Sequence, residues 1–131
     1  LRAVGALTSG AMAGQTLSDL DMEGIDLSGA EFDGCHLDGA SLVNCKLVGA
    51  KLRAASFTSA SLDGANLSFA DLTGADITED ALQRCGSLWH ATLPSGQKYR
   101  GQWRLPLESE MAAGYGLDLD AQEDFRQFFG T

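Results

Sequence analysis

The sequence predicts an all-β repeat fold in which short extended segments alternate with turns. Two observations lead to this prediction. Every fifth residue from Leu7 to Leu82 is large and apolar, at sixteen positions in succession. From Ala30 to Ala75, the residue two places before each of these is small and apolar. A helix repeats about every 3.6 residues and a strand every two, so a period of five fits one extended piece followed by one turn.

The turns are predicted from the residue that precedes each small one. A type II turn needs a positive φ at its third position, which Gly and Asn adopt at the least cost. Most units carry one of these two residues there: Gly24, Gly29, Gly34, Gly39, Asn44, Gly49, Gly64 and Gly74. Ala54, Ser59 and Phe69 break this rule. Those three corners therefore either use a different turn type or carry strain.

The units DLSGA and ANLSFADLTGADI resemble the pentapeptide-repeat family, strongly over residues 16–80 and loosely over residues 5–15. This resemblance implies a right-handed quadrilateral β-helix, in which four pentapeptides make one square coil. Residues twenty apart would then stack on one face. The regular units suffice for three coils, and the looser ones extend the limit to four.

The charged residues agree with this stacking. Three columns at a spacing of twenty each place one basic residue beside acidic or polar ones: Glu31–Lys51–Asp71, Asp33–Arg53–Thr73 and Asp26–Lys46–Asn66. Neighbouring coils lie roughly 4.8 Å apart, so opposite charges in one column stabilise the stack modestly. The charge pattern supports four-sided coils independently of the period of five.

We predict three parts: an N-terminal cap or irregular first coil over 1–15, the β-helix over 16–85, and a C-terminal hairpin with a helical cap over 86–131. Gln15 and Asp80 would occupy inward slots, where an unpaired polar group is costly, so they predict the two ends of the regular stack. An open end is an exposed sheet edge and needs a cover.

The tail itself predicts three short elements. The segments SLWHATL and QKYRGQW around a Pro-Ser-Gly turn indicate a hairpin. A short helix is expected over 107–113. A second is expected to open with a capping box from Asp120 to Glu123, to run to about Phe129 and to be closed by Gly130.

Phe125, Phe128 and Phe129 share one face of that last helix. One interpretation is a lid packed over the last coil, which favours a monomer. The other is a homodimer interface through the C-terminal helix, which the resemblance to gyrase-binding relatives implies. The lid is the favoured interpretation, because a bare coil end would be an aggregation template.

Composition excludes several function classes. The net charge is −9, which argues against direct nucleic-acid binding, and no apolar run is long enough to span a membrane. Cys35 and Cys45 fill small inward slots and are expected to be core residues. His36 and His90 are isolated, so we expect neither a catalytic site, nor a cofactor, nor a metal.

The sequence therefore predicts a non-enzymatic scaffold or protein-interaction module with an unknown protein partner. The alternative, implied by the family resemblance, is a DNA-mimicking modulator of a type II topoisomerase, since residues 16–80 hold twelve acids and three bases. The candidate partner-binding residues are Asp21, Glu23, Asp38, Asp63, Phe125, Phe128 and Phe129. A cytoplasmic location is favoured, with a lumenal or periplasmic one left open.

Overall fold

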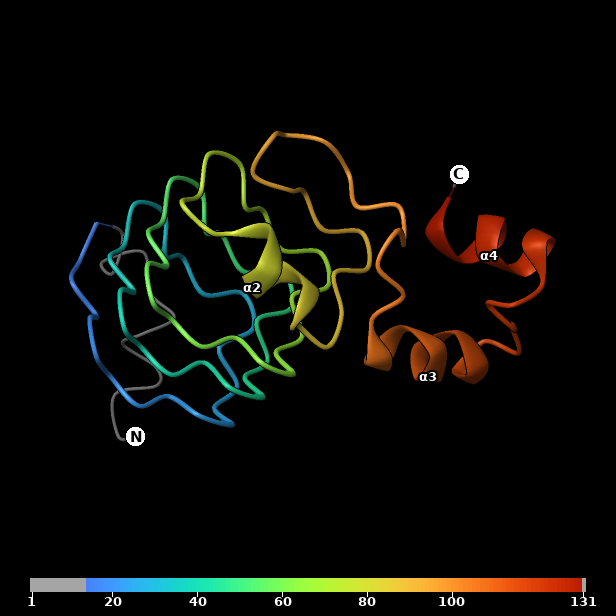
Figure 1. Ribbon diagram of the computed structural model, residues 1–131, viewed down its shortest axis with the longest axis horizontal. Helices are drawn as coiled ribbons and strands as arrows, with labels where there is room; N and C mark the ends of the chain where they lie inside the picture. The colour runs from blue at the N-terminus through green and yellow to red at the C-terminus, as the bar shows by residue number, and fades with distance from the viewer. Residues whose placement is uncertain (1–13, 131) are drawn as a thin grey trace.

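Four ladders of parallel backbone pairing organise the computed structural model, which describes residues 14–130 (Figure 1). Each ladder joins residues twenty apart: Thr16 with His36, Asp21 with Ser41, Asp26 with Lys46, and Glu31 with Lys51. The pairing repeats upward as far as Ser56 with Asp76. Each pairing is a single-residue bridge because a turn follows every short extended piece. The predicted period of twenty and the three charge columns are confirmed.

The large and small apolar slots both face the inside of the coils. Leu27, Phe32 and Leu52 are fully buried among the large residues, and Ala30 and Ala50 among the small ones. Burial of such side chains stabilises a fold by about 25 cal/mol for each Å² of apolar surface removed from water. Leu7 and Met12, which extend the same register, lie outside the described residues. The other large slots form one continuous core.

The corners at Ala54, Ser59 and Phe69, which the sequence singled out, use the same left-handed backbone as the corners with Gly or Asn. The φ angles of Ala54, Ser59 and Phe69 are 59°, 60° and 63°. The strained alternative is therefore the one that the structure adopts. An L-residue with a side chain is disfavoured in this region by roughly 1–2 kcal/mol, because its Cβ approaches the following carbonyl oxygen.

This strain predicts that Ala54→Gly stabilises the protein. Ala54 is exposed, and its N–H donates to the Thr73 carbonyl oxygen at 2.9 Å, a bond that glycine keeps. We expect a gain of about 0.5–1 kcal/mol in the free energy of unfolding, since relief of the left-handed strain exceeds the extra entropy of glycine in the unfolded chain. Urea unfolding measures it. Ala113→Gly, at an exposed helical position, is the control and should destabilise instead.

The regular path of the coils is interrupted at α2 (Glu79–Gln83), where the chain departs from the wall of the β-helix. Below the break, Ser56 pairs with Asp76; beyond it, Asn66 pairs with Ser87, so the spacing grows from twenty to twenty-one. Thr78 is the N-cap of this helix, because its side-chain oxygen accepts a hydrogen bond from the Ala81 N–H at 3.1 Å. One extra residue therefore accommodates a short helix between two regular sides.

Parallel pairing continues past residue 85, where the sequence placed the end of the β-helix. Asp71 pairs with Thr92, and Thr92 then pairs in antiparallel fashion with Lys98. The expected hairpin around the Pro-Ser-Gly turn is present, and its first arm is also the last side of the stack. The chain then forms α3 (Pro106–Gly114) and α4 (Gln122–Phe129), which lie together beyond the last coil (Figure 1).

Both tail helices lie where the sequence predicted them, but the predicted capping box is wrong. Ala121 is the residue that precedes α4, and it makes no side-chain capping bond. The Asp120 carboxylate instead accepts a hydrogen bond from the Arg104 guanidinium at 2.9 Å. Gly130 closes the helix at a φ of 71°, as predicted.

Candidate functional site

The break at α2 leaves part of a sheet edge unpaired. On either side of it the rungs are intact: the Phe57 N–H donates to the Asp76 oxygen and the Gly64 N–H to the Arg84 oxygen, each at 2.9 Å. Between these rungs, the Ser59 N–H, the Ala60 carbonyl and the Leu62 N–H have no hydrogen-bond partner within residues 14–130. These are the backbone groups that a regular coil would engage.

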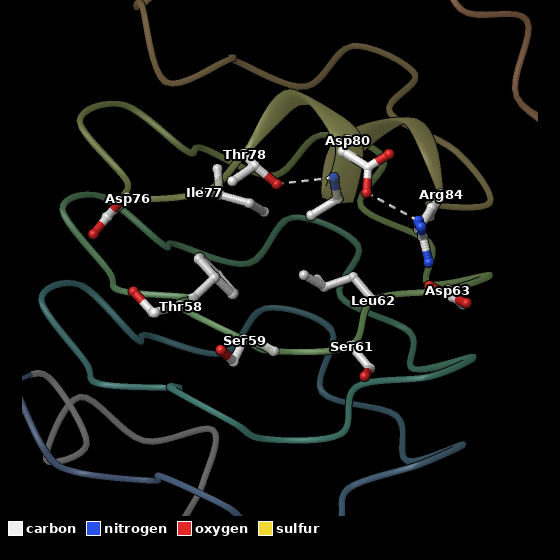
Figure 2. Close-up of a pocket in the computed structure, with 13 residues that line it drawn as sticks. Thr58, Ser59, Ser61, Leu62, Asp63, Asp76, Ile77, Thr78, Asp80 and Arg84 are labelled. Atoms are coloured by element: carbon white, nitrogen blue, oxygen red, sulfur yellow. Dashed lines mark hydrogen bonds and ion pairs between the residues drawn. The ribbon is translucent and has the colours of Figure 1, made fainter.

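A groove of about 500 Å³ lies over this edge (Figure 2). Ile77 on one side and Leu62 on the other extend into the space between α2 and the coil, and Ala60 and Ala81 also line it. The Ser59 hydroxyl points away from the space (Figure 2). Apolar side chains therefore form one part of the lining, beside polar residues such as Thr58, Thr78 and Asp80.

Carboxylates surround the groove. Asp63 and Asp76 lie at opposite ends of it (Figure 2), and both residues are exposed. Neither forms an ion pair within the described part of the chain. Arg84, the one cation of the lining, is bound to Asp80 at 3.1 Å. The rim is therefore acidic, with two uncompensated carboxylates.

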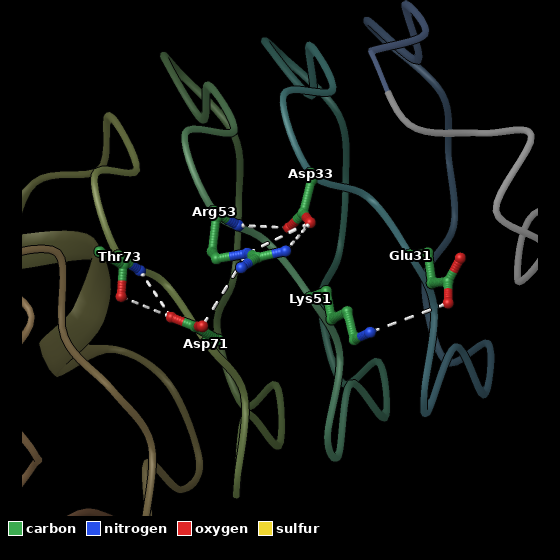
Figure 3. A network of polar contacts seen from close by, with 6 residues as sticks. All are labelled: Glu31, Asp33, Lys51, Arg53, Asp71 and Thr73. Carbon is green, nitrogen blue, oxygen red and sulfur yellow. Dashed lines mark hydrogen bonds and ion pairs between the residues drawn. The ribbon is translucent and has the colours of Figure 1, made fainter.

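The acids of the wall that carries Glu31, Lys51 and Asp71, opposite the wall that carries Ser61, are largely neutralised by bases (Figure 3). Arg53 contacts the Asp33 carboxylate at 2.7 Å and the Asp71 carboxylate at 4.0 Å, while Lys51 lies 3.9 Å from Glu31. The hydrogen bond from Arg53 lowers the pKa of Asp33 below its usual value. These charges hold adjacent coils together and leave little potential for a partner.

The four acids proposed from the sequence do not form one cluster. Asp38 accepts hydrogen bonds from the Ser56 hydroxyl and, at 3.2 Å, from the Thr58 N–H, so the next coil occupies its carboxylate. Asp21 accepts from the Glu23 N–H at 3.1 Å, and both residues are exposed. Of the four, Asp63 is the one that borders the groove.

The three phenylalanines do come together, and they pack inside the chain. Phe128 and Phe129 are buried, with ring centroids 5.0 Å apart, and the Phe125 ring lies 4.7 Å from that of Phe129. Trp89 of the last coil stacks on Phe128 at 4.7 Å, and its ring N–H donates to the Phe128 carbonyl at 2.7 Å. The face proposed as a partner site thus contacts the end of the stack.

Glu108 of α3 is a buried acid that the sequence did not single out. Its carboxylate accepts from the Tyr99 hydroxyl at 2.8 Å, the Leu88 N–H at 3.0 Å and the Leu105 N–H at 3.1 Å. Burial raises the pKa of Glu108 and that of Tyr99. In sequence, a lone Glu in a short helix is indistinguishable from a surface residue. The groove had a local signal in the sequence, because Thr78 followed by Glu79 and Asp80 is a helix start, and α2 is the element that interrupts the coil there.

The described residues offer little for metal or nucleophilic chemistry. Within residues 14–130, no three His, Cys, Asp or Glu side chains gather as a potential metal site. Cys35, Cys45 and Cys85 are buried as thiols, and burial raises the pKa of Cys85 to about 12. None of the helices between residues 14 and 130 is long and apolar enough to cross a membrane.

The ladders and their five-residue units define a repeat protein with a β-helix fold. The family described as pentapeptide repeats (8 copies) matches residues 16–53 and 40–79. Residues 16–79 of the chain belong to the pentapeptide-repeat family, which implies a right-handed β-helix. A search of curated proteins found no match.

Three solved structures are similar to this chain. HetL, a pentapeptide repeat protein involved in heterocyst differentiation regulation in the cyanobacterium Nostoc, is 29% identical over 64% of this chain and 43% of its own, with a TM-score of 0.39. A pentapeptide repeat protein of the Arabidopsis thaliana thylakoid lumen is 26% identical over 64% and 61%, with a TM-score of 0.30. The plasmid-mediated fluoroquinolone resistance protein QnrB1 is 20% identical over 63% and 57%, with a TM-score of 0.29. The matched part of this chain thus spans less than two thirds of each.

Proposed function

We propose that this chain is a non-enzymatic protein-interaction module. The proposal rests on the unpaired backbone edge at Ser59 and Ala60. Two carboxylates without an ion-pair partner in the described residues lie beside this edge, and the coils below it on the same wall are paired with one another. A regular β-helix is stiff because each coil is bonded to the next along its whole length. Such a wall presents a fixed surface to a partner without a large ordering cost.

The titratable groups that are buried have structural roles, which supports a non-enzymatic function. Glu108 and Tyr99 bond to each other and are buried. Cys85 is buried, and its thiol donates to the Ala81 carbonyl at 3.6 Å. A general acid or base has to reach a substrate, and these groups face the protein.

We further propose that α3 and α4 cap the C-terminal end of a stack of three to four coils, and that the protein is a monomer. Support comes from the contacts of both helices with the last coil: the Leu107 N–H donates to the Gly86 carbonyl at 2.9 Å, and Phe128 lies against Trp89. Phe128 and Phe129 are buried within the chain, so they are not available to a second copy. The capping is tested through Glu108 in the Discussion.

Affinity capture tests the interaction function. The whole protein is immobilised and exposed to extract from its source, and any enriched protein is purified and titrated back against it. We expect a saturable 1:1 complex that is lost when the module is thermally unfolded beforehand. Equal retention by folded and unfolded module, or no saturable binding by any purified candidate, would contradict the proposal.

A DNA-mimicking modulator of a type II topoisomerase is the second candidate function. It is favoured by exposed acids such as Asp21, Glu23 and Asp63, which lack an ion-pair partner within the described residues. Against it, Arg53 and Lys51 interrupt the negative surface. A gyrase supercoiling assay with added protein separates the two candidates: inhibition or protection supports mimicry, and no effect at high protein concentration removes it.

A further inference from the structure

We propose that the groove beside α2 binds an extended basic peptide segment of a partner protein, which adds to the open edge as a short parallel strand. The proposal rests on the interaction function above and names the site and the chemistry of the partner. Strand addition to an exposed edge obtains affinity from main-chain hydrogen bonds and specificity from the pockets for alternate side chains.

The coil below shows which groups the incoming segment has to supply. There, the groups equivalent to the Ser59 N–H, the Ala60 carbonyl and the Leu62 N–H belong to Gly39, Ala40 and Leu42. They are bonded to the Thr58 oxygen at 2.8 Å, the Ser61 N–H at 3.0 Å and the Ser61 oxygen at 2.7 Å, in that order. A stretch of four extended residues, equivalent to 58–61, therefore completes the missing rungs.

The chain's own next segment does not complete them, because its backbone groups are engaged in α2. The Ala81 N–H is bound to the Thr78 side-chain oxygen at 3.1 Å, and the Thr78 carbonyl accepts from the Leu82 N–H at 3.1 Å. Occupation of the edge from within would require α2 to unfold. The edge is thus available to a separate chain, first at Ser59, which is exposed, and at Ala60, which is half-buried.

The lining specifies the side chains of the occupant. Ala60, Ile77 and Ala81 are half-buried and offer an apolar surface to every second residue of an extended segment. Asp63 and Asp76 stand exposed at the two ends of the groove, and Asp80 is compensated by Arg84. An alternation of β-branched and basic residues fits this arrangement, with the basic residues pairing with the two free carboxylates.

The test uses the intact protein and a fluorescein-labelled octapeptide in which valine and lysine alternate. Fluorescence anisotropy is expected to show saturable binding. We expect it to weaken at least tenfold when the lysines are replaced by glutamates, and at least tenfold when the four central backbone amides are N-methylated. The double variant Asp63→Asn with Asp76→Asn should bind at least fivefold more weakly. The matched control, Asp21→Asn with Glu23→Gln, removes two acids elsewhere on the surface and should bind like the native protein.

Amide hydrogen exchange locates the peptide. In the free protein, the Ser59 amide should exchange much faster than its paired equivalent at Gly39, and the peptide should slow it. Equal binding of the N-methylated peptide, or unchanged exchange at Ser59, would overturn the strand-addition proposal. Sedimentation should show a monomer. A dimer dispersed by Lys98→Glu would overturn the proposal of a separate partner, because it would mean that a second copy of this chain fills the groove with its hairpin, which carries Lys98 and Arg100. If the peptide fails while affinity capture yields a partner, this proposal fails and the interaction function stands.

Discussion

Replacement of Leu52 by arginine is expected to abolish the folded state. Leu52 is fully buried, and so are Phe32 and Leu72, which lie twenty residues away on either side in the same inward column. An unpaired charge in such a site costs several kcal/mol even after relaxation, and the longer side chain also overpacks the column. A small domain has only about 5–15 kcal/mol of stability in total.

Circular dichroism during heating, together with limited proteolysis, measures this result. We expect Leu52→Arg to show no cooperative transition and to be cleaved rapidly. Lys51→Arg is the matched control, because it places the same guanidinium one residue away on the exposed wall. Its melting temperature should stay near that of the native protein. A native-like transition for Leu52→Arg would contradict the inward placement of the fifth-position residues.

Replacement of Glu108 by alanine is expected to detach the helical end of the molecule from the coils. The Leu88 N–H, the Leu105 N–H and the Tyr99 hydroxyl would all lose their acceptor in a buried site. Each unsatisfied buried group costs about 1–3 kcal/mol, so we expect a loss of at least 3 kcal/mol in the free energy of unfolding. Urea unfolding measures it, and binding of a hydrophobic dye should rise as the last coil is uncovered.

The variant Glu108→Gln should be intermediate, because an amide offers one acceptor oxygen where the carboxylate offers two. Comparison of the native protein with Glu108→Gln also isolates the part of the pH dependence of stability that comes from the ionisation of Glu108. The pKa of Glu108 is raised in the folded state, so its stabilising contribution is complete below the unfolded value of about 4.3 and is lost as pH rises through the folded value. The stability of the native protein relative to Glu108→Gln should therefore fall with rising pH. An unchanged stability of Glu108→Ala would show that this carboxylate does not attach the cap.

The repeat could be predicted almost completely from sequence because its signals are local and redundant. Each inward position requires a side chain of a certain size, and each corner requires a residue that tolerates a left-handed backbone. Both requirements recur in every coil along a column. Ala54, Ser59 and Phe69 show the limit of this kind of prediction. The sequence locates these corners, but it does not decide between a strained left-handed backbone and a different turn type. The neighbouring rungs impose the left-handed backbone there against the local preference.

The break at α2 could not be predicted from the period, because Ile77 and Leu82 keep the register through it. The local signals for a helix are a Thr followed by two acids, Thr78 with Glu79 and Asp80, and these outweigh the repeat over one side of one coil. Glu108 was missed for another reason. Its partners are Leu88, Tyr99 and Leu105, and only the tertiary arrangement shows that it is buried.

The change of spacing from twenty to twenty-one across α2 has a consequence for how this protein tolerates alteration of its length. Elsewhere in the stack, one inserted residue would turn every following inward side chain outward. Between Asp76 and Arg84 the chain bulges away from the wall and rejoins it in phase, so a loop of different length there leaves the pairing of later coils intact. This corner is the natural place for insertions, whether they arise during divergence or by design.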